Sequence, residues 1–199
     1  MNKYPKRKNH RLKEYDYTRA GYYYITICTY NRDLLFGEII NKPVGPQRAV
    51  AVILNEYGKI VDEEWQNTQR LRENIRSDKY IIMPNHIHGI IIINDHDVGI
   101  DNRRGVRSNA PTEPNNNINP ENYFSQISPQ SGTLGVIIRA YISSVTRWCR
   151  KNNYDQSIWQ RNYYEHIIRN DKELYEIRKY IINNPMKWEL DNEHPRNRC

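Results

Sequence analysis

The sequence predicts an α+β fold, ferredoxin-like in outline, in which helices pack on a mostly antiparallel sheet. Short apolar and β-branched runs that are typical of strands occupy residues 22–30, 80–83 and 86–93. Apolar side chains recur at helical spacing over residues 48–66, 134–151 and 171–184. With a further short strand expected before the last helix, the chain order is β-α-β-β-α-β-α. This alternation of strands and helices indicates the α+β class.

The predicted strands are the clearest elements. Residues 22–30 (YYYITICTY) are rich in β-branched and aromatic side chains, and the polar residues 31–33 then turn the chain. Pro84 and Asn85 separate the two apolar runs at 80–83 and 86–93. The second run holds four consecutive isoleucines, so we expect a central strand covered on both faces.

The helices differ in the strength of their boundary signals. In the first, at 48–66, the repeating apolar side chains are Val50, Ile53, Leu54, Tyr57, Val61 and Trp65. In the second, at 134–151, the apolar stripe consists of Leu134, Ile137, Ile138, Val145 and Trp148. The third is expected to start near Asn170 or Asp171, either of which can cap it, and to end before Pro185.

Three stretches carry little periodicity. Residues 97–132 contain four prolines and a run of asparagines, which predicts a flexible insertion in a single domain spanning 1–199. A short strand is expected around residues 158–160. The tail after residue 190 is polar, and we expect it to fray.

Positive charge is clustered. The chain has 30 Lys and Arg against 23 Asp and Glu, a net charge of +7. Residues 1–13 carry six cations without an acid, and the predicted helix at 134–151 presents Arg139, Arg147 and Arg150, also without an acid. Clustered cations are typical of nucleic-acid binding, although a soluble basic surface has the same composition. Arg161 lies among aromatic residues that could stack on bases or simply pack at a strand edge.

The remaining composition indicates the compartment. The three cysteines lie far apart and form no CxxC pair, which favours a reducing cytoplasm. The basic N-terminus has no apolar run behind it, and the longest apolar stretch, at 90–93, is far too short to span a bilayer. We therefore expect a cytoplasmic protein with no membrane partner.

His86 and His88 are the most informative pair. Side chains at i and i+2 of a strand point to one face, so the two imidazoles project together and could ligate a metal. The alternative is a strand that turns two polar residues to solvent, which the apolar flanks disfavour. A His-x-His-x-His hydrolase would need a third histidine where Ile90 stands. The motif of a helical zinc protease, His-Glu-x-x-His, does not occur.

Tyr180 and Asn184 lie four residues apart on the last predicted helix, which places them on one helical face. They flank the apolar stripe of that helix, whose members are Leu174, Ile177 and Ile181. A phenol beside a carboxamide can serve as a nucleophile next to a metal ligand. The same spacing also fits an interfacial tyrosine followed by a helix-ending asparagine.

Four blocks in order resemble one known family, the REP-associated tyrosine transposases. The blocks are residues 24–32 (YITICTYNR), 83–89 (MPNHIHG), 159–170 and 180–188 (YIINNPMKW). This family is a branch of the HUH single-tyrosine transposases, which are named for a His-hydrophobic-His motif. The resemblance covers most of residues 15–190 apart from the 97–132 insertion.

The resemblance implies a nuclease with a ferredoxin-like core that cuts and rejoins single-stranded DNA near a hairpin, acting as a monomer or homodimer. It implies that His86, His88 and Asn184 bind a divalent ion, Mg²⁺ or Mn²⁺, and that Tyr180 forms a 5′-phosphotyrosine link. Two other functions fit the same residues. One is a non-catalytic binding protein for single-stranded DNA or RNA on this fold, and the other is a phosphoesterase that uses water.

A second tyrosine, Tyr141, could be mistaken for the nucleophile. It falls in the middle of the apolar stripe of the helix at 134–151. We therefore expect it to pack in the core with its hydroxyl hydrogen-bonded.

Overall fold

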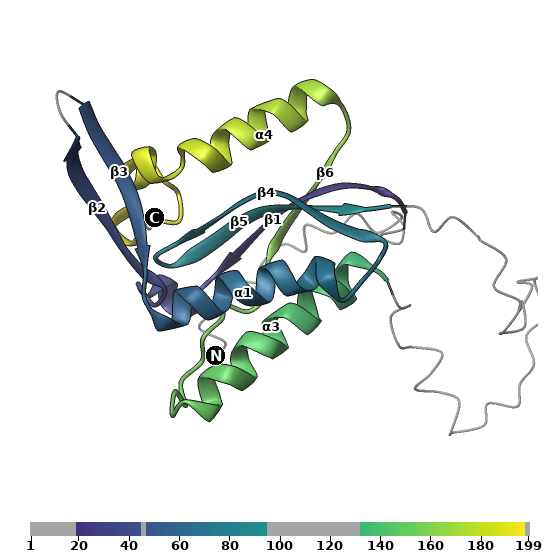
Figure 1. Ribbon diagram of the computed structural model, residues 1–199, viewed down its shortest axis with the longest axis horizontal. Coiled ribbons are helices and arrows are strands. Elements are labelled where there is room, and N and C mark those ends of the chain that lie inside the picture. Colours follow the sequence, from purple (N-terminus) through teal and green to yellow (C-terminus); the bar gives the residue numbers. More distant parts are fainter. Residues whose placement is uncertain (1–18, 45–46, 95–131, 198–199) are drawn as a thin grey trace, which may run out of the picture.

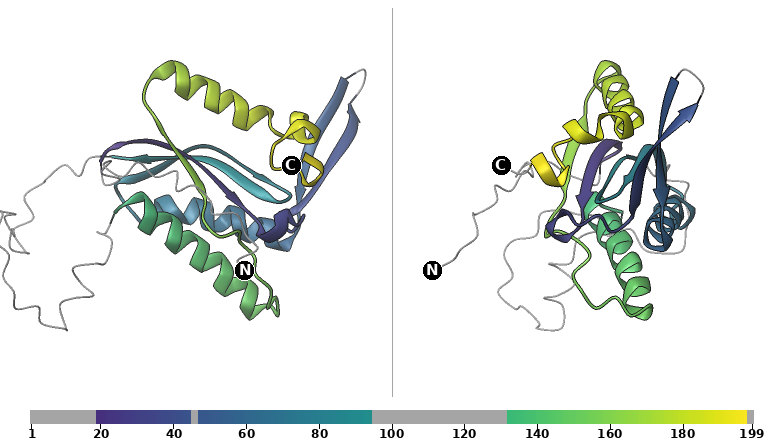
Figure 2. Two further views of the ribbon diagram at one scale, coloured as in Figure 1. Left: turned by 180° about the vertical axis from the view of Figure 1, so that it is seen from behind. Right: turned by 90° about the vertical axis from the view of Figure 1, so that its left-hand side faces the viewer.

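Figure 1 shows the computed structural model of the protein, which describes residues 19–44, 47–94 and 132–197. An antiparallel sheet has the strand order β4-β5-β1-β6. Its strands are β1 (Gly21–Cys28), β4 (Ile75–Met83), β5 (His86–Ile93) and β6 (Tyr164–Ile168). Helices α1 (Glu56–Arg70) and α3 (Leu134–Lys151) cover one face, and α4 (Asp171–Asn183) crosses the other (Figure 2). The predicted α+β class is confirmed.

The two faces of the sheet have cores of very different size. The larger core lies under α1 and α3 and includes Tyr23, Ile25, Ile87 and the fully buried indole of Trp65. The buried core under α4 is small and consists of Ile90, Ile168, Leu174 and Ile181. β5 is an inner strand with almost every side chain buried, as its isoleucine run predicts. Because little of the α4 face is apolar, polar side chains occupy the rest of it.

The prediction of one helix over residues 48–66 was wrong in its first half. Strands β2 (Gly37–Val44) and β3 (Gln47–Leu54) form a separate two-stranded sheet, and α1 begins only at Glu56. The run of β-branched and small apolar residues before position 55 favours a strand, and its apolar spacing fits a helix only by coincidence. Asn55 sets the true boundary, because its side chain accepts a hydrogen bond from the backbone N–H of Gly58 (3.0 Å).

The other two helices are confirmed. Thr133 caps α3 by accepting a hydrogen bond from the Val136 amide, and Asn170 caps α4 by accepting one from the Glu173 amide. The expected apolar stripe of α3 is buried, except that Trp148 is half-buried. Leu174 and Ile181 of the α4 stripe are buried and Ile177 packs beside them. Helical periodicity together with a capping side chain is thus enough to define both elements.

Two expectations about the C-terminal third were wrong. Around residues 158–160 there is only an isolated bridge between Thr29 and Trp159, and the strand itself is β6, at 164–168. The described residues after 190 are folded, because they include the short helix η3 (Pro195–Asn197), and Asp191, which directly follows the short helix η2 (Pro185–Leu190), is buried. The insertion expected at 97–132 and the basic residues 1–13 lie outside the described residues, Gly132 excepted.

No helix in the described part of the chain combines the length and the apolar character that a membrane crossing requires.

Candidate metal centre and tyrosine

β5 directs His86 and His88 toward α4. Both side chains are buried, and their ring centroids lie 4.3 Å apart. Ile87 and Gly89, the alternating positions, face α1 on the other side of the sheet, where a Cβ at Gly89 would lie 2.4 Å from the Trp65 ring. Strand geometry therefore pairs the two imidazoles, as predicted from their spacing.

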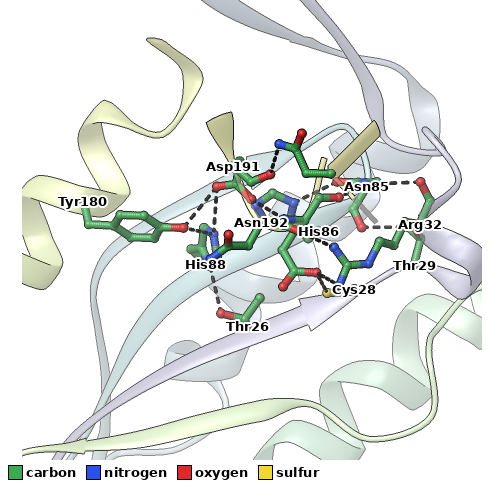
Figure 3. A network of polar contacts seen from close by, with 12 residues as sticks. Thr26, Cys28, Thr29, Arg32, Asn85, His86, His88, Tyr180, Asp191 and Asn192 are labelled. Carbon is green, nitrogen blue, oxygen red and sulfur yellow. Dashed lines mark hydrogen bonds and ion pairs between the residues drawn. The ribbon is translucent and has the colours of Figure 1, made fainter. Parts of the chain in front are cut away.

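A buried asparagine fixes the tautomer of His86 (Figure 3). The amide nitrogen of Asn85 donates to the backbone carbonyls of Arg32 (3.1 Å) and Glu193 (2.8 Å). Its oxygen therefore faces the imidazole, where it lies 2.8 Å from Nδ1. Nδ1 must carry the proton to make this hydrogen bond, which leaves the lone pair on Nε2. Nε2 of His86 is buried and has no hydrogen-bond partner in the described structure.

Two hydroxyl groups of β1 form hydrogen bonds with Nδ1 of His88. Its Nδ1 lies 2.8 Å from the Tyr24 hydroxyl and 2.9 Å from the Thr26 hydroxyl. Either hydroxyl oxygen can accept a hydrogen bond from a protonated Nδ1, and Nε2 then offers its lone pair on the opposite side. On that side Nε2 lies 3.3 Å from the Tyr180 hydroxyl and 3.9 Å from a carboxylate oxygen of Asp191.

Asp191 completes the group, and the sequence did not predict it. One ligand atom from each of His86, His88 and Asp191 lies within 4.8 Å of the others, and all three residues are buried. Asp191 Oδ2 accepts hydrogen bonds from the Tyr180 hydroxyl (3.0 Å) and the Asn184 amide (2.5 Å). Its Oδ1 accepts one from the Glu193 backbone amide (2.6 Å). No motif or spacing distinguishes Asp191 from the other polar residues of the tail.

Burial and neighbouring charges set the ionisation of this group. Burial lowers the pKa of His86 well below its usual value, and the His88 ring lowers it further. Burial alone would raise the pKa of Asp191, but the histidine rings and the amide donors around it outweigh burial and hold that pKa below its usual value. His86 is therefore a neutral imidazole, and Asp191 is a carboxylate.

Tyr180 is kept protonated by the same surroundings. Burial raises the pKa of Tyr180 above its usual value, and the negative charge of Asp191 raises it further. The phenol consequently donates a hydrogen bond to Asp191 and is a weak nucleophile in this state.

The residues present fit a divalent cation. Neutral imidazoles and a carboxylate are metal ligands, and a buried imidazole lone pair with no partner is otherwise unfavourable. A second buried atom, Oδ1 of Asn184, also lacks a hydrogen-bond partner in the described structure. The buried group of His86, His88 and Asp191 can bind a metal ion, and Asn184 Oδ1 is a further oxygen beside it.

The structure thus brings together four residues singled out in the sequence, namely His86, His88, Tyr180 and Asn184. Tyr141 lies elsewhere, on the side of the sheet covered by α1 and α3. It is buried, and its hydroxyl donates to the Val61 carbonyl (3.1 Å), as expected for a core tyrosine.

The arginines do not join this group. Arg139, Arg147 and Arg150 are exposed on α3, across the sheet from α4. Arg161 is exposed just before β6. A contact with DNA at the three α3 arginines would therefore be made across the sheet from the buried histidines.

Comparison with known proteins relates the chain to one relative in sequence. No family model matches it. A protein of Haemophilus influenzae described as uncharacterised is 40% identical over 185 residues, which cover 93% of this chain and 91% of the relative. The two proteins belong to one family.

A solved structure shares the fold. The structure described as a REP-associated tyrosine transposase bound to a REP hairpin superposes with a TM-score of 0.53 over 89% of this chain and 74% of that chain, at 17% identity. At this identity the likeness concerns the fold alone. It confirms, at that level, the resemblance found in the sequence.

Proposed function

We propose that this protein is a metal-dependent transposase-type nuclease that nicks and rejoins single-stranded DNA near a hairpin through a phosphotyrosine intermediate. The observation that carries the proposal is the position of the Tyr180 hydroxyl, 3.0 Å from Asp191 and 3.3 Å from His88 Nε2. A tyrosine that merely filled the interface between α4 and the sheet would not need to meet a buried metal-binding group.

His86 and His88 would hold the ion through their Nε2 atoms, with oxygen ligands from Asp191 and Asn184. We propose Mn²⁺ or Mg²⁺ as the ion, because the oxygen ligands from Asp191 and Asn184 suit both and the substrate is a phosphate. When bound, the ion polarises the scissile phosphate and neutralises the charge that develops in the transition state.

The residues themselves position and deprotonate the nucleophile. Tyr180 Oη attacks the phosphorus, so a bond from Oη to phosphorus forms and the bond to the 3′ oxygen breaks. The phenol proton passes to Asp191 Oδ2, which already accepts its hydrogen bond. The 3′ oxygen leaves as a hydroxyl by taking this same proton from Asp191, so no proton is gained or lost overall. Rejoining is the reverse transesterification and requires no nucleotide cofactor.

The fold of the hairpin-bound transposase supports single-stranded DNA with a hairpin as the substrate. Exposed arginines on α3 add positive charge for its phosphates. A non-catalytic binding protein on this fold is the alternative. It would bind the same DNA without forming a covalent link.

The test is to incubate the protein with a library of single-stranded hairpins plus Mn²⁺ and to score covalent adducts on a denaturing gel. The wild-type protein should form an adduct. Tyr180→Phe should form none while retaining hairpin binding, because only one oxygen is removed. Tyr141→Phe is the matched control and should keep the adduct, since its hydroxyl contacts only the core. An adduct that survives in Tyr180→Phe would show that another residue is the nucleophile.

A further inference from the structure

A groove of about 450 Å³ opens beside the tyrosine, between α4 and the β1–β6 side of the sheet. Its volume lies in the range of small-molecule sites, roughly 300–1,000 Å³. It shares Tyr24 and Tyr180 with the metal centre, where the Tyr24 hydroxyl lies 2.8 Å from His88 Nδ1. A ligand whose phosphate lay at Tyr180 could therefore extend its neighbouring group into the groove.

Aromatic rings surround this groove. Tyr164, at the start of β6, is 45% exposed, and its ring meets Tyr24 edge-on with centroids 6.2 Å apart. Tyr180 also meets Tyr24 edge-on, at 6.5 Å, and is 40% exposed. Both outer rings keep a large solvent-exposed surface in addition to their contacts with Tyr24. Exposed aromatic faces are a general means of holding the bases of single strands by stacking.

The charges in the groove exclude phosphate and favour hydrogen-bond donors. Glu173 and Glu176 are among its lining residues, and none of the described lining residues is a Lys or Arg. Glu173 is fixed in place, because its Oε1 lies 2.6 Å from His166 Nε2 and its Oε2 accepts a hydrogen bond from the Arg169 amide (2.8 Å). Glu176 is exposed on the same face of α4, one turn before Tyr180. Carboxylates repel a phosphate group but accept hydrogen bonds from amino groups.

On the basis of the nicking function proposed above, we propose that this groove binds the unpaired base next to the attacked phosphate and selects one with an exocyclic amino group. The base stacks on Tyr164, and its amino group donates to Glu176. Carboxylate side chains accept such hydrogen bonds from cytosine N4, whereas thymine offers a carbonyl oxygen at the same position. The acidic lining keeps the sugar–phosphate chain outside, at Tyr180.

Fluorescence anisotropy with labelled oligo-dC and oligo-dT in EDTA tests the groove without metal or cleavage. The wild-type protein should bind oligo-dC more tightly than oligo-dT. Tyr164→Leu should weaken binding of both by about fivefold or more, as expected when a stacking ring is removed. Glu176→Gln should bring the preference close to one, because an amide offers a donor as well as an acceptor. Tyr175→Leu is the matched control: this tyrosine is 61% exposed on α4 outside the groove, so affinity and preference should stay at wild-type values.

The anisotropy experiment and the covalent-adduct experiment can fail independently of each other. A dC preference that depends on Tyr164 and Glu176, in a protein that forms no adduct, would support the groove and overturn the nicking function. Equal wild-type binding of both oligonucleotides would overturn the groove. The groove proposal would also be overturned if Tyr164→Leu bound the oligonucleotides with wild-type affinity and Glu176→Gln kept the wild-type preference for oligo-dC. Neither result would affect a phosphotyrosine adduct observed separately.

Discussion

Asp191 accepts hydrogen bonds from the Tyr180 phenol, the Asn184 amide and the Glu193 backbone, and it lies beside both histidines. Removing its charge while keeping its shape should therefore affect the metal more than the fold. We expect Asp191→Asn to weaken Mn²⁺ binding by at least about tenfold, the effect that follows removal of even an outer-shell partner. Isothermal titration calorimetry with Mn²⁺ measures this directly.

Glu193→Gln provides the control for that measurement. Glu193 is a carboxylate two residues away, but it pairs with Arg32 (2.8 Å) and accepts a hydrogen bond from the Cys28 thiol (3.0 Å), outside the metal-binding group. The Mn²⁺ affinity of this variant should stay within about twofold of wild type. If Asp191→Asn binds Mn²⁺ normally and Asn184→Ala does not, Asn184 supplies the oxygen ligand and Asp191 only orients it.

The sequence predicts those parts of the site whose arrangement is set within one strand or one helix, and it does not predict the parts that depend on contacts between distant segments. His86 with His88, and Tyr180 with Asn184, follow from the periods of a strand and a helix, which place each pair on one face. Asp191 and Asn85 depend on the chain after α4 folding back over β5. No local period encodes that return, so the carboxylate and the residue that fixes the His86 tautomer were not predicted.

At the level of elements, β5 can pack against α1 only because position 89 carries no side chain. A Cβ on Gly89 would lie 2.4 Å from Trp65 Cζ2, whereas a Cβ on Gly21 would meet nothing closer than 3.7 Å. We expect Gly89→Ala to lower the free energy of unfolding by about 1–3 kcal/mol through overpacking. Gly21→Ala, the control, should change it by much less. Urea unfolding followed by circular dichroism measures the free energy of unfolding of both variants. If Gly89→Ala leaves this free energy unchanged, α1 can shift to make room for the added methyl group.

The elements also differ in how well their sequences define them. α3 and α4 have capping residues and continuous apolar stripes, so their predicted bounds agree with the structure to within about a residue. Residues 50–54 satisfy a helical spacing and a strand composition at once. Cross-strand pairing with β2 decides the outcome, and a single-sequence pattern does not reveal that partner.

For the whole molecule, the sheet separates the basic helix from the metal centre. Neutralising Arg139, Arg147 and Arg150 should weaken binding of single-stranded DNA and reduce the slope of log affinity against log salt, by about 0.7 for each phosphate that the protein no longer neutralises. Mn²⁺ affinity should be unchanged, because α3 lies across the sheet from α4. Anisotropy titrations over a range of salt concentrations test this. Neutralising three other exposed cations, Lys59 and Arg70 of α1 and Lys79 of β4, controls for the loss of three positive charges. A slope unaltered by the arginine changes would indicate that they form only a solvated surface.

The histidines, the tyrosine and the carboxylate of the site lie far apart in the sequence, so the complete site can form only after most of the chain has been synthesised. His88 and Tyr180 are 92 residues apart, and Asp191 comes 11 residues later still. β1, which supports His88, pairs on its other edge with β6, just before α4. During synthesis on the ribosome, a chain that has been made only as far as residue 179 contains both histidines but lacks the tyrosine and the carboxylate. Loop-closure entropy must be overcome before contacts of such long range form, so the nicking activity proposed for the protein would be acquired only once these distant segments have come together.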